Sequence, residues 1–86
     1  MDNEGMENKA KRLISEIALE ITREWKRPVI AARPYLNAML SLGKITDMYG
    51  CDDGRTIVLY FLNNSVAFRG DVVRRCKAEL KEHLKG

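Results

Sequence analysis

The chain has 86 residues, enough for one small domain, which would bury only about 60 to 65% of the surface that its unfolded form exposes. No stretch approaches the ~20 consecutive apolar residues of a membrane span, and residues 1–5 lack the basic and apolar regions of a signal peptide, so we expect a cytoplasmic protein with no membrane partner. The net charge of +3 is weak evidence for an anionic partner, because acidic and basic residues are both frequent.

The first predicted element is a long amphipathic helix. Residues 1–6 are polar and are expected to form a disordered tail ahead of a single α+β domain over residues 7–86. The helix is predicted to begin near Glu7 and to end before Pro28, because proline lacks an N–H and disfavours the α conformation of Arg27. Its apolar side chains recur at helical spacing: Ala10, Leu13, Ile14, Ile17, Ala18, Ile21 and Trp25.

A second helical segment follows over residues 29–42, with Pro34 inside it. Proline in a helix interior would cost ~3 kcal/mol, so we expect a break at that position. The prediction is a short helical turn over residues 29–32 and then a helix that has Pro34 at its first position. Gly43 is the expected end of this helix.

Residues 56–62 form a continuous run of β-branched, aromatic and aliphatic side chains, which we interpret as a strand buried on both faces. Residues 45–49 could pair with it in an antiparallel hairpin whose loop, residues 50–54, is rich in turn formers, with Asp53-Gly54 as the expected corner. The predicted fold is therefore α+β: helix, helix, β-hairpin and helix, with a two-stranded antiparallel sheet packed on the helices.

In such a strand, Val58, Tyr60 and Leu62 would point to one side, and only three helices would be available to cover both faces. An uncovered face and unpaired edges favour a homodimer or another protein partner at these three residues. The alternative is that the first and last helices cover opposite faces and leave a monomer.

The last helix has two possible starts. It could begin at Ser65, with Gly70 inside it, or at Asp71, with Phe68-Arg69-Gly70 as a structured loop. In either case its apolar residues share one face. Across the whole chain, the predicted core comprises Leu13, Ile17, Ile21, Trp25, Leu36, Leu40, Ile57, Leu59, Phe61, Val72, Cys76 and Leu80.

The last helix also separates its charges. Arg74, Lys77, Lys81 and Lys85 fall within a roughly 80° arc, and Arg69 would lie near one end of it. These five residues are the candidate site for an anion or a nucleic acid, because each cation can neutralise a phosphate. The simpler interpretation is a solvated face, since neither an aromatic RNA-binding pattern nor a recognisable reading helix accompanies them.

The sequence predicts neither a metal site nor catalysis, and hence no cofactor. It has no closely spaced cysteine or histidine pair, and His83 is interpreted as a partly buried structural residue. No nucleophile has a visible base, so we expect a protein that is not an enzyme. The two cysteines, Cys51 and Cys76, are too few for a disulfide framework and are expected to stay thiols.

Several scattered motifs carry a resemblance: RPYLNAM at residues 33–39, Tyr49-Gly50, YFLNNS at residues 60–65 and Phe68-Arg69-Gly70. Over residues 25–85 the chain resembles short uncharacterised proteins of bacterial phages and prophage-like mobile elements. The resemblance implies a bacterial cytoplasmic setting and a phage or prophage accessory role, and it brings no known activity. We therefore expect a small protein-binding accessory module. The alternative is a nucleic-acid-binding module that uses the five cations of the candidate site, Arg69, Arg74, Lys77, Lys81 and Lys85, which we call the ridge.

Overall fold

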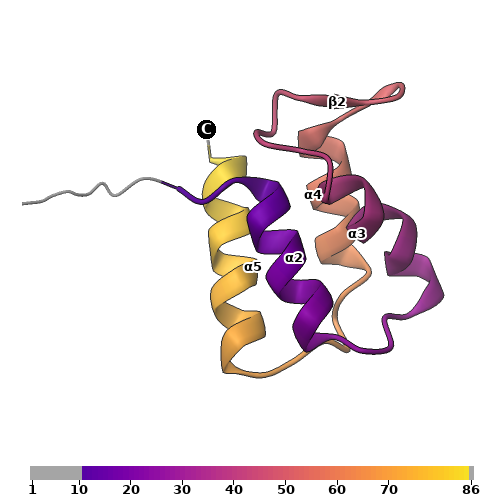
Figure 1. Cartoon of the computed structure of the whole chain (residues 1–86), viewed down its shortest axis with the longest axis vertical. Helices are drawn as coiled ribbons and strands as arrows, with labels where there is room; N and C mark the ends of the chain where they lie inside the picture. The colour runs from indigo at the N-terminus through magenta and orange to yellow at the C-terminus, as the bar shows by residue number, and fades with distance from the viewer. Residues whose placement is uncertain (1–10, 86) are drawn as a thin grey trace, which may run out of the picture.

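The computed structural model describes residues 11–85, in which four α-helices, one 3-10 turn and two short strands follow one another (Figure 1). The predicted α+β class, with a two-stranded antiparallel sheet packed on helices, is confirmed. The predicted tail over residues 1–6 and the predicted helix start at Glu7 lie outside the described residues. In chain order the elements are α2 (Ile14–Glu24), η1 (Ile30–Ala32), α3 (Arg33–Met39), β2 (Met48–Tyr49), β3 (Asp52–Asp53), α4 (Gly54–Asn63) and α5 (Asp71–Leu84).

The first described helix, α2, begins at Ile14, later than predicted. The backbone of Leu13 is extended, and its N–H donates to Oε1 of Glu16 at 2.8 Å. The N–H of Ile14 donates to the carbonyl oxygen of Gly43 at 3.0 Å. The segment that follows α3 therefore satisfies a backbone donor that the first turn of a helix leaves without an intrahelical partner.

The two prolines act as predicted. The helix α2 ends at Glu24, before Pro28. The next segment divides into the short turn η1 and the helix α3, which has Pro34 in its first turn, where the missing N–H breaks no helical hydrogen bond. The α-helix ends at Met39, slightly earlier than expected.

The strand predicted over residues 56–62 is wrong, because these residues belong to the helix α4. Its buried residues, Gly54, Ile57, Val58 and Phe61, follow the helical spacing of three, four and seven positions. The side chain of Asp53 caps the helix, since its Oδ1 accepts a hydrogen bond from the N–H of Thr56 at 2.9 Å.

The hairpin is consequently much shorter than predicted. Met48 pairs with Asp53 and Tyr49 with Asp52, which leaves a turn of two residues. Gly50 occupies that turn with φ +63°, a conformation that glycine adopts without strain. The predicted corner at Asp53-Gly54 is instead the start of α4.

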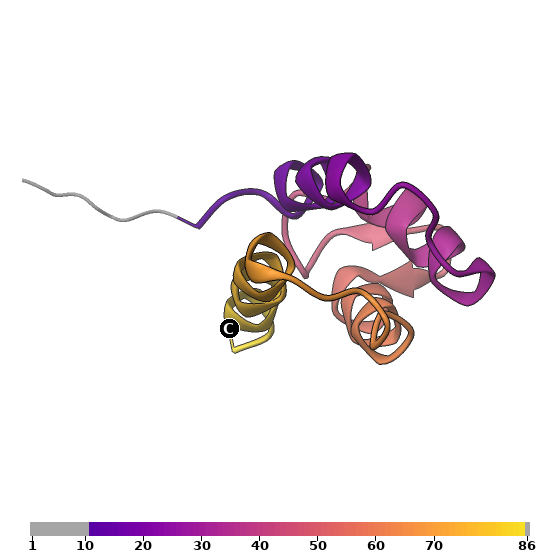
Figure 2. The same ribbon diagram turned by 90° about the horizontal axis from the view of Figure 1, so that it is seen from below.

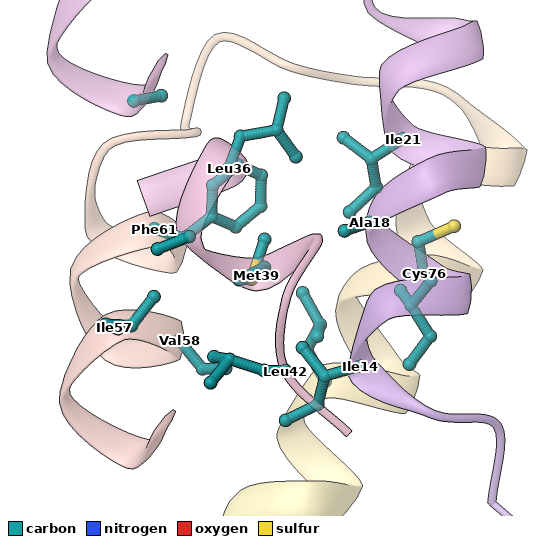
Figure 3. Close-up of a cluster of buried hydrophobic side chains, with 14 of the residues drawn as sticks. Ile14, Ala18, Ile21, Leu36, Met39, Leu42, Ile57, Val58, Phe61 and Cys76 are labelled. Atoms are coloured by element: carbon teal, nitrogen blue, oxygen red, sulfur yellow. The ribbon is translucent and has the colours of Figure 1, made fainter. Parts of the chain in front are cut away.

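The core lies between the helices. The helix α2 packs against α5 and α3, and α4 packs against α3 and α5 (Figures 1 and 2). Figure 3 shows side chains of α2, α3 and α4 converging, with Cys76 contributed by α5. The buried residues include seven of the predicted core: Ile17, Ile21, Leu36, Ile57, Phe61, Cys76 and Leu80.

Five predicted core residues differ from expectation. Leu13, Leu40 and Leu59 are exposed, whereas Trp25 and Val72 are only partly buried and pack against the edge of the core. The exposure of Leu59 follows directly from the helix, since this residue lies on the face of α4 opposite Ile57 and Phe61. Other buried residues lie outside the predicted core set, among them Ile14, Ala18, Met39, Leu42, Val58 and Val73.

Over residues 11–85 no helix is both long enough and apolar enough to cross a membrane.

Candidate functional site

The helix α5 begins at Asp71, so the second of the two predicted starts is correct. Phe68-Arg69-Gly70 is a structured loop, in which the N–H of Phe68 donates to the carbonyl oxygen of Ser65 at 3.0 Å. Gly70 has φ +122°, outside the range that other residues favour, and this conformation turns the chain into α5. The loop fixes the position of Arg69 next to the first turns of the helix.

Lys77 holds this loop against α5. Its Nζ donates to the carbonyl oxygens of Ser65, at 2.7 Å, and Phe68, at 3.0 Å. These acceptors are neutral, so the ammonium keeps its charge uncompensated. Burial lowers the pKa of Lys77, and the positive charges of Lys81 and Arg69 lower it further. Lys77 therefore lies within a cluster of like charges.

A depression of about 250 Å³ lies where the loop meets α5. Three of the five predicted cations, Arg69, Arg74 and Lys77, line it. The remaining lining is mostly apolar, from Val66, Phe68 and Val73, together with Gly70. We call it the loop pocket. The structure thus brings the first three residues of the predicted site together around a concave surface.

The other two predicted cations, Lys81 and Lys85, continue along the same face of α5. At 1.5 Å per residue they lie about 6 and 12 Å beyond Lys77 along the helix axis. The Nζ of Lys85 pairs with Glu82 at 3.0 Å, and Arg74 lies 3.6 Å from Asp71, in pairs that are largely exposed to solvent. Such exposed pairs neutralise the ridge only weakly.

Other carboxylates of α2 and α5 are paired away from this ridge. Glu79 accepts from both Nε and a terminal nitrogen of Arg12, at 2.8 and 2.7 Å, and Glu20 pairs with Arg12 and with Arg75. The hydrogen bond from Arg12 lowers the pKa of Glu79, and the hydrogen bond from Arg75 lowers that of Glu20. These ion pairs lie where α2 packs against α5, whereas the ridge lies on another side of α5.

A second basic segment, which the sequence interpretation missed, lies at the end of α2 and in the connection to α3. Between positions 23 and 33 the only acid is Glu24, and the exposed cations are Arg23, Lys26, Arg27 and Arg33. Trp25 in this segment stacks on Phe68 of the loop pocket, with ring centroids 4.5 Å apart. The connections from α2 to η1 and from α4 to α5 both run along the lower end of the molecule (Figure 1). The excess of basic residues was visible in the sequence, but its proximity to Arg69 was not.

The predicted interface residues do not form one exposed face. Val58 is fully buried in the core, and Leu62 is partly buried beside it. Tyr60 is about half exposed and contacts Tyr35 edge to face, with centroids 5.5 Å apart. The strand face that predicted a homodimer at these residues is therefore absent from α4.

His83 has the structural role that was predicted. It is buried, and its Nε2 donates to the carbonyl oxygen of Arg12 at 2.7 Å. Both cysteines are free thiols: Cys51 is exposed, and burial raises the pKa of Cys76. Within residues 11–85, no three histidine, cysteine or acidic side chains gather in a way that could hold a metal ion.

Comparison of the chain with protein-family models, with curated proteins and with solved structures finds no match. The resemblance to phage and prophage proteins stays a prediction.

Proposed function

We propose that the protein is a non-catalytic nucleic-acid-binding module whose contacts are made by the ridge on α5 and the basic segment beside it. The observation that carries the proposal is the convergence of Arg69, Arg74 and Lys77 around the loop pocket. Because Trp25 stacks on Phe68, the cations of residues 23–33 lie at the same end of the molecule as the loop pocket.

The distribution of charge supports a polyanion as the ligand. Net charge alone would not, but the carboxylates Glu20 and Glu79 are paired with arginines along the contact between α2 and α5. The ridge therefore keeps a local excess of positive charge that the net charge of +3 understates. Regularly spaced phosphates complement cations that recur along one face of a helix.

The binding that we propose is to the sugar-phosphate backbone. Phosphate contacts position a protein on nucleic acid but carry no sequence information. The ridge cations lie at exposed or partly exposed positions. Asp71 and Glu82 pair with Arg74 and Lys85, but both pairs are largely exposed to solvent, so they compete only weakly with a phosphate. We therefore expect sequence-independent affinity that depends strongly on salt.

The experiment is fluorescence anisotropy with a labelled oligonucleotide over a series of salt concentrations. If the five ridge cations each contact a phosphate, log K should fall with log salt with a slope of about −3.5 on a single strand. The double variant Arg69→Glu and Arg74→Glu should weaken binding more than about tenfold. Lys77 is unsuitable for this test because it also holds the loop.

The matched control is Lys11→Glu with Lys44→Glu, which changes the net charge by the same amount. These residues line a different depression, next to His83 at the far end of α5. The control should bind nearly as well as the wild type. Equal losses in the two double variants would indicate general charge attraction and contradict the assigned surface, and a wild type that fails to bind at low salt would refute the function.

A protein-binding accessory role in a phage or prophage setting stays a prediction. Because residues 56–62 form a helix, the large apolar side chains of α4 that remain exposed for a protein partner are Leu59 and Tyr60. The same anisotropy experiment separates the two functions, because a module that binds only protein gives no salt-dependent signal with an oligonucleotide.

A further inference from the structure

The loop pocket combines two kinds of surface. Arg69, Arg74 and Lys77 supply positive charge, and Val66, Phe68 and Val73 supply an apolar wall. Val66 is 70% exposed, so most of its apolar side chain is open to solvent beside the three cations. A phosphate alone would use the cations and leave the apolar wall unused.

A nucleotide carries both matching groups, an anionic phosphate and a flat base with apolar faces. We infer that the loop pocket binds one unstacked nucleotide of a single strand, with its phosphate on the cations and its base against Val66. This inference rests on the proposed function and names the form of nucleic acid that the module prefers.

The size and shape of the pocket agree with one nucleotide better than with a larger ligand. Its volume of about 250 Å³ is below the usual ~300 to 1,000 Å³ of pockets that enclose a drug-sized ligand. In a duplex the bases are paired and stacked, so a base could not enter the pocket without being extruded. A single strand can turn a base outward at little cost.

The aromatic ring in the pocket is not free to stack on that base. Phe68 is buried and has one face covered by Trp25. The base would therefore pack against Val66, which leaves the guanidinium groups of Arg69 and Arg74 to bind the phosphate. Asp71, the acid nearest to Arg74, is 97% exposed and pairs with it at 3.6 Å, so it can turn away when a phosphate arrives.

Trp25 can report on binding at the end of the molecule that holds the loop pocket. It is the only tryptophan of the chain, and it stacks on Phe68, which lines the pocket. A nucleotide in the pocket should alter the emission of Trp25 through Phe68. Phosphates bound only at Lys81 and Lys85, farther along α5, should leave that emission unchanged.

The experiment titrates the full chain with unlabelled oligodeoxythymidine of about 16 nucleotides, the upper end of the site size of small single-strand-binding domains. The same strand annealed to its complement is titrated in parallel, with Trp25 emission as the readout. Affinities for the two forms are measured separately, by the anisotropy of a fluorescently labelled copy of each. The single strand should bind more tightly and change the emission. The variant Val66→Ser removes the apolar surface that the base would cover, so it should lose about three- to tenfold of the single-strand affinity and none of the duplex affinity.

The matched control is Leu19→Ser, which shortens an exposed aliphatic side chain on α2, outside the loop pocket. Equal affinity for the two forms of DNA, or equal behaviour of Val66→Ser and Leu19→Ser, would overturn the inference while leaving the proposed function intact. Absence of binding to either form would refute the proposed function, and this inference with it.

Discussion

The indole of Trp25 and the ring of Phe68 are stacked, with centroids 4.5 Å apart and planes within 7° of parallel. Trp25 follows α2 directly, and Phe68 belongs to the loop before α5, so the stack joins two segments that are far apart in the chain. Phe61 of α4 meets the same indole edge to face, with centroids 6.4 Å apart. Through these contacts the core fixes the two basic segments relative to each other.

Replacing Phe68 with leucine should test this connection. The substitution keeps an apolar side chain in a buried position but removes the stack, which is worth about 0.5 to 1.5 kcal/mol beyond area burial. We expect a loss of that size in urea unfolding followed by circular dichroism, with a shift of Trp25 emission in the folded state. The control Tyr60→Leu removes an aromatic contact to Tyr35 instead and should leave the emission unchanged.

Gly54 offers a prediction in which two effects have opposite signs. Helix propensity favours alanine over glycine by up to ~1 kcal/mol. A Cβ at Gly54, however, would lie 2.8 Å from the Cα of Ile45 and 2.8 Å from the carbonyl oxygen of Lys44, which are backbone atoms that cannot rotate away. The steric effect should dominate, so Gly54→Ala should lower the free energy of unfolding by about 1 to 3 kcal/mol.

The control for this prediction is Gly50→Ala. Gly50 has open space around its Cβ position and a positive φ, so alanine there should cost only the backbone strain, about 1 kcal/mol. A Gly54→Ala protein that is more stable than the wild type in urea unfolding would contradict the close approach of α4 to Ile45.

The sequence predicted correctly those helices in which polar residues alternate with apolar ones at helical spacing. The apolar stripe of α2 alternates with charged side chains, and Pro34 and Gly70 mark the breaks beside α3 and α5. Residues 56–62 contain no strongly polar position after Thr56, so strand and helix spacing fit equally well. The helix is favoured by features outside the run: the cap from Asp53 and burial against α3 and α5.

Alanine substitutions at Ile57 and Leu59 distinguish the two interpretations energetically. In a strand both side chains would lie on one buried face, so the two alanine substitutions would lower the free energy of unfolding by about the same amount. In α4, Ile57 is 3% exposed and Leu59 is 43% exposed. Ile57→Ala should therefore cost about 2 to 5 kcal/mol, and Leu59→Ala less than about 1 kcal/mol, in denaturant unfolding. Equal losses would restore the strand interpretation.

The candidate site was predictable in part for a similar reason. The ridge from Arg74 to Lys85 needs only the helical period of α5, so its residues could be grouped from the sequence. The second basic segment joins it through the contact of Trp25 with Phe68, a long-range pairing that no local pattern encodes. The hydrogen bonds of Lys77 to the loop depend equally on how that loop folds back.

The ion pairs between α2 and α5 predict how stability depends on pH. The hydrogen bonds from Arg12 lower the pKa of Glu79 below its ordinary value of 4.5 in the folded state, so the unfolded chain binds the proton more readily. The contribution is fully present above about pH 4.5 and is lost as the pH falls through the folded-state pKa. Glu79→Gln should reduce the free energy of unfolding at pH 7 by about 1 kcal/mol after solvent screening, and this difference from the wild type should shrink on acidification. Urea unfolding at a series of pH values measures it, with Glu24→Gln on the exposed end of α2 as the control; a difference that stays constant below pH 4.5 would contradict the assignment.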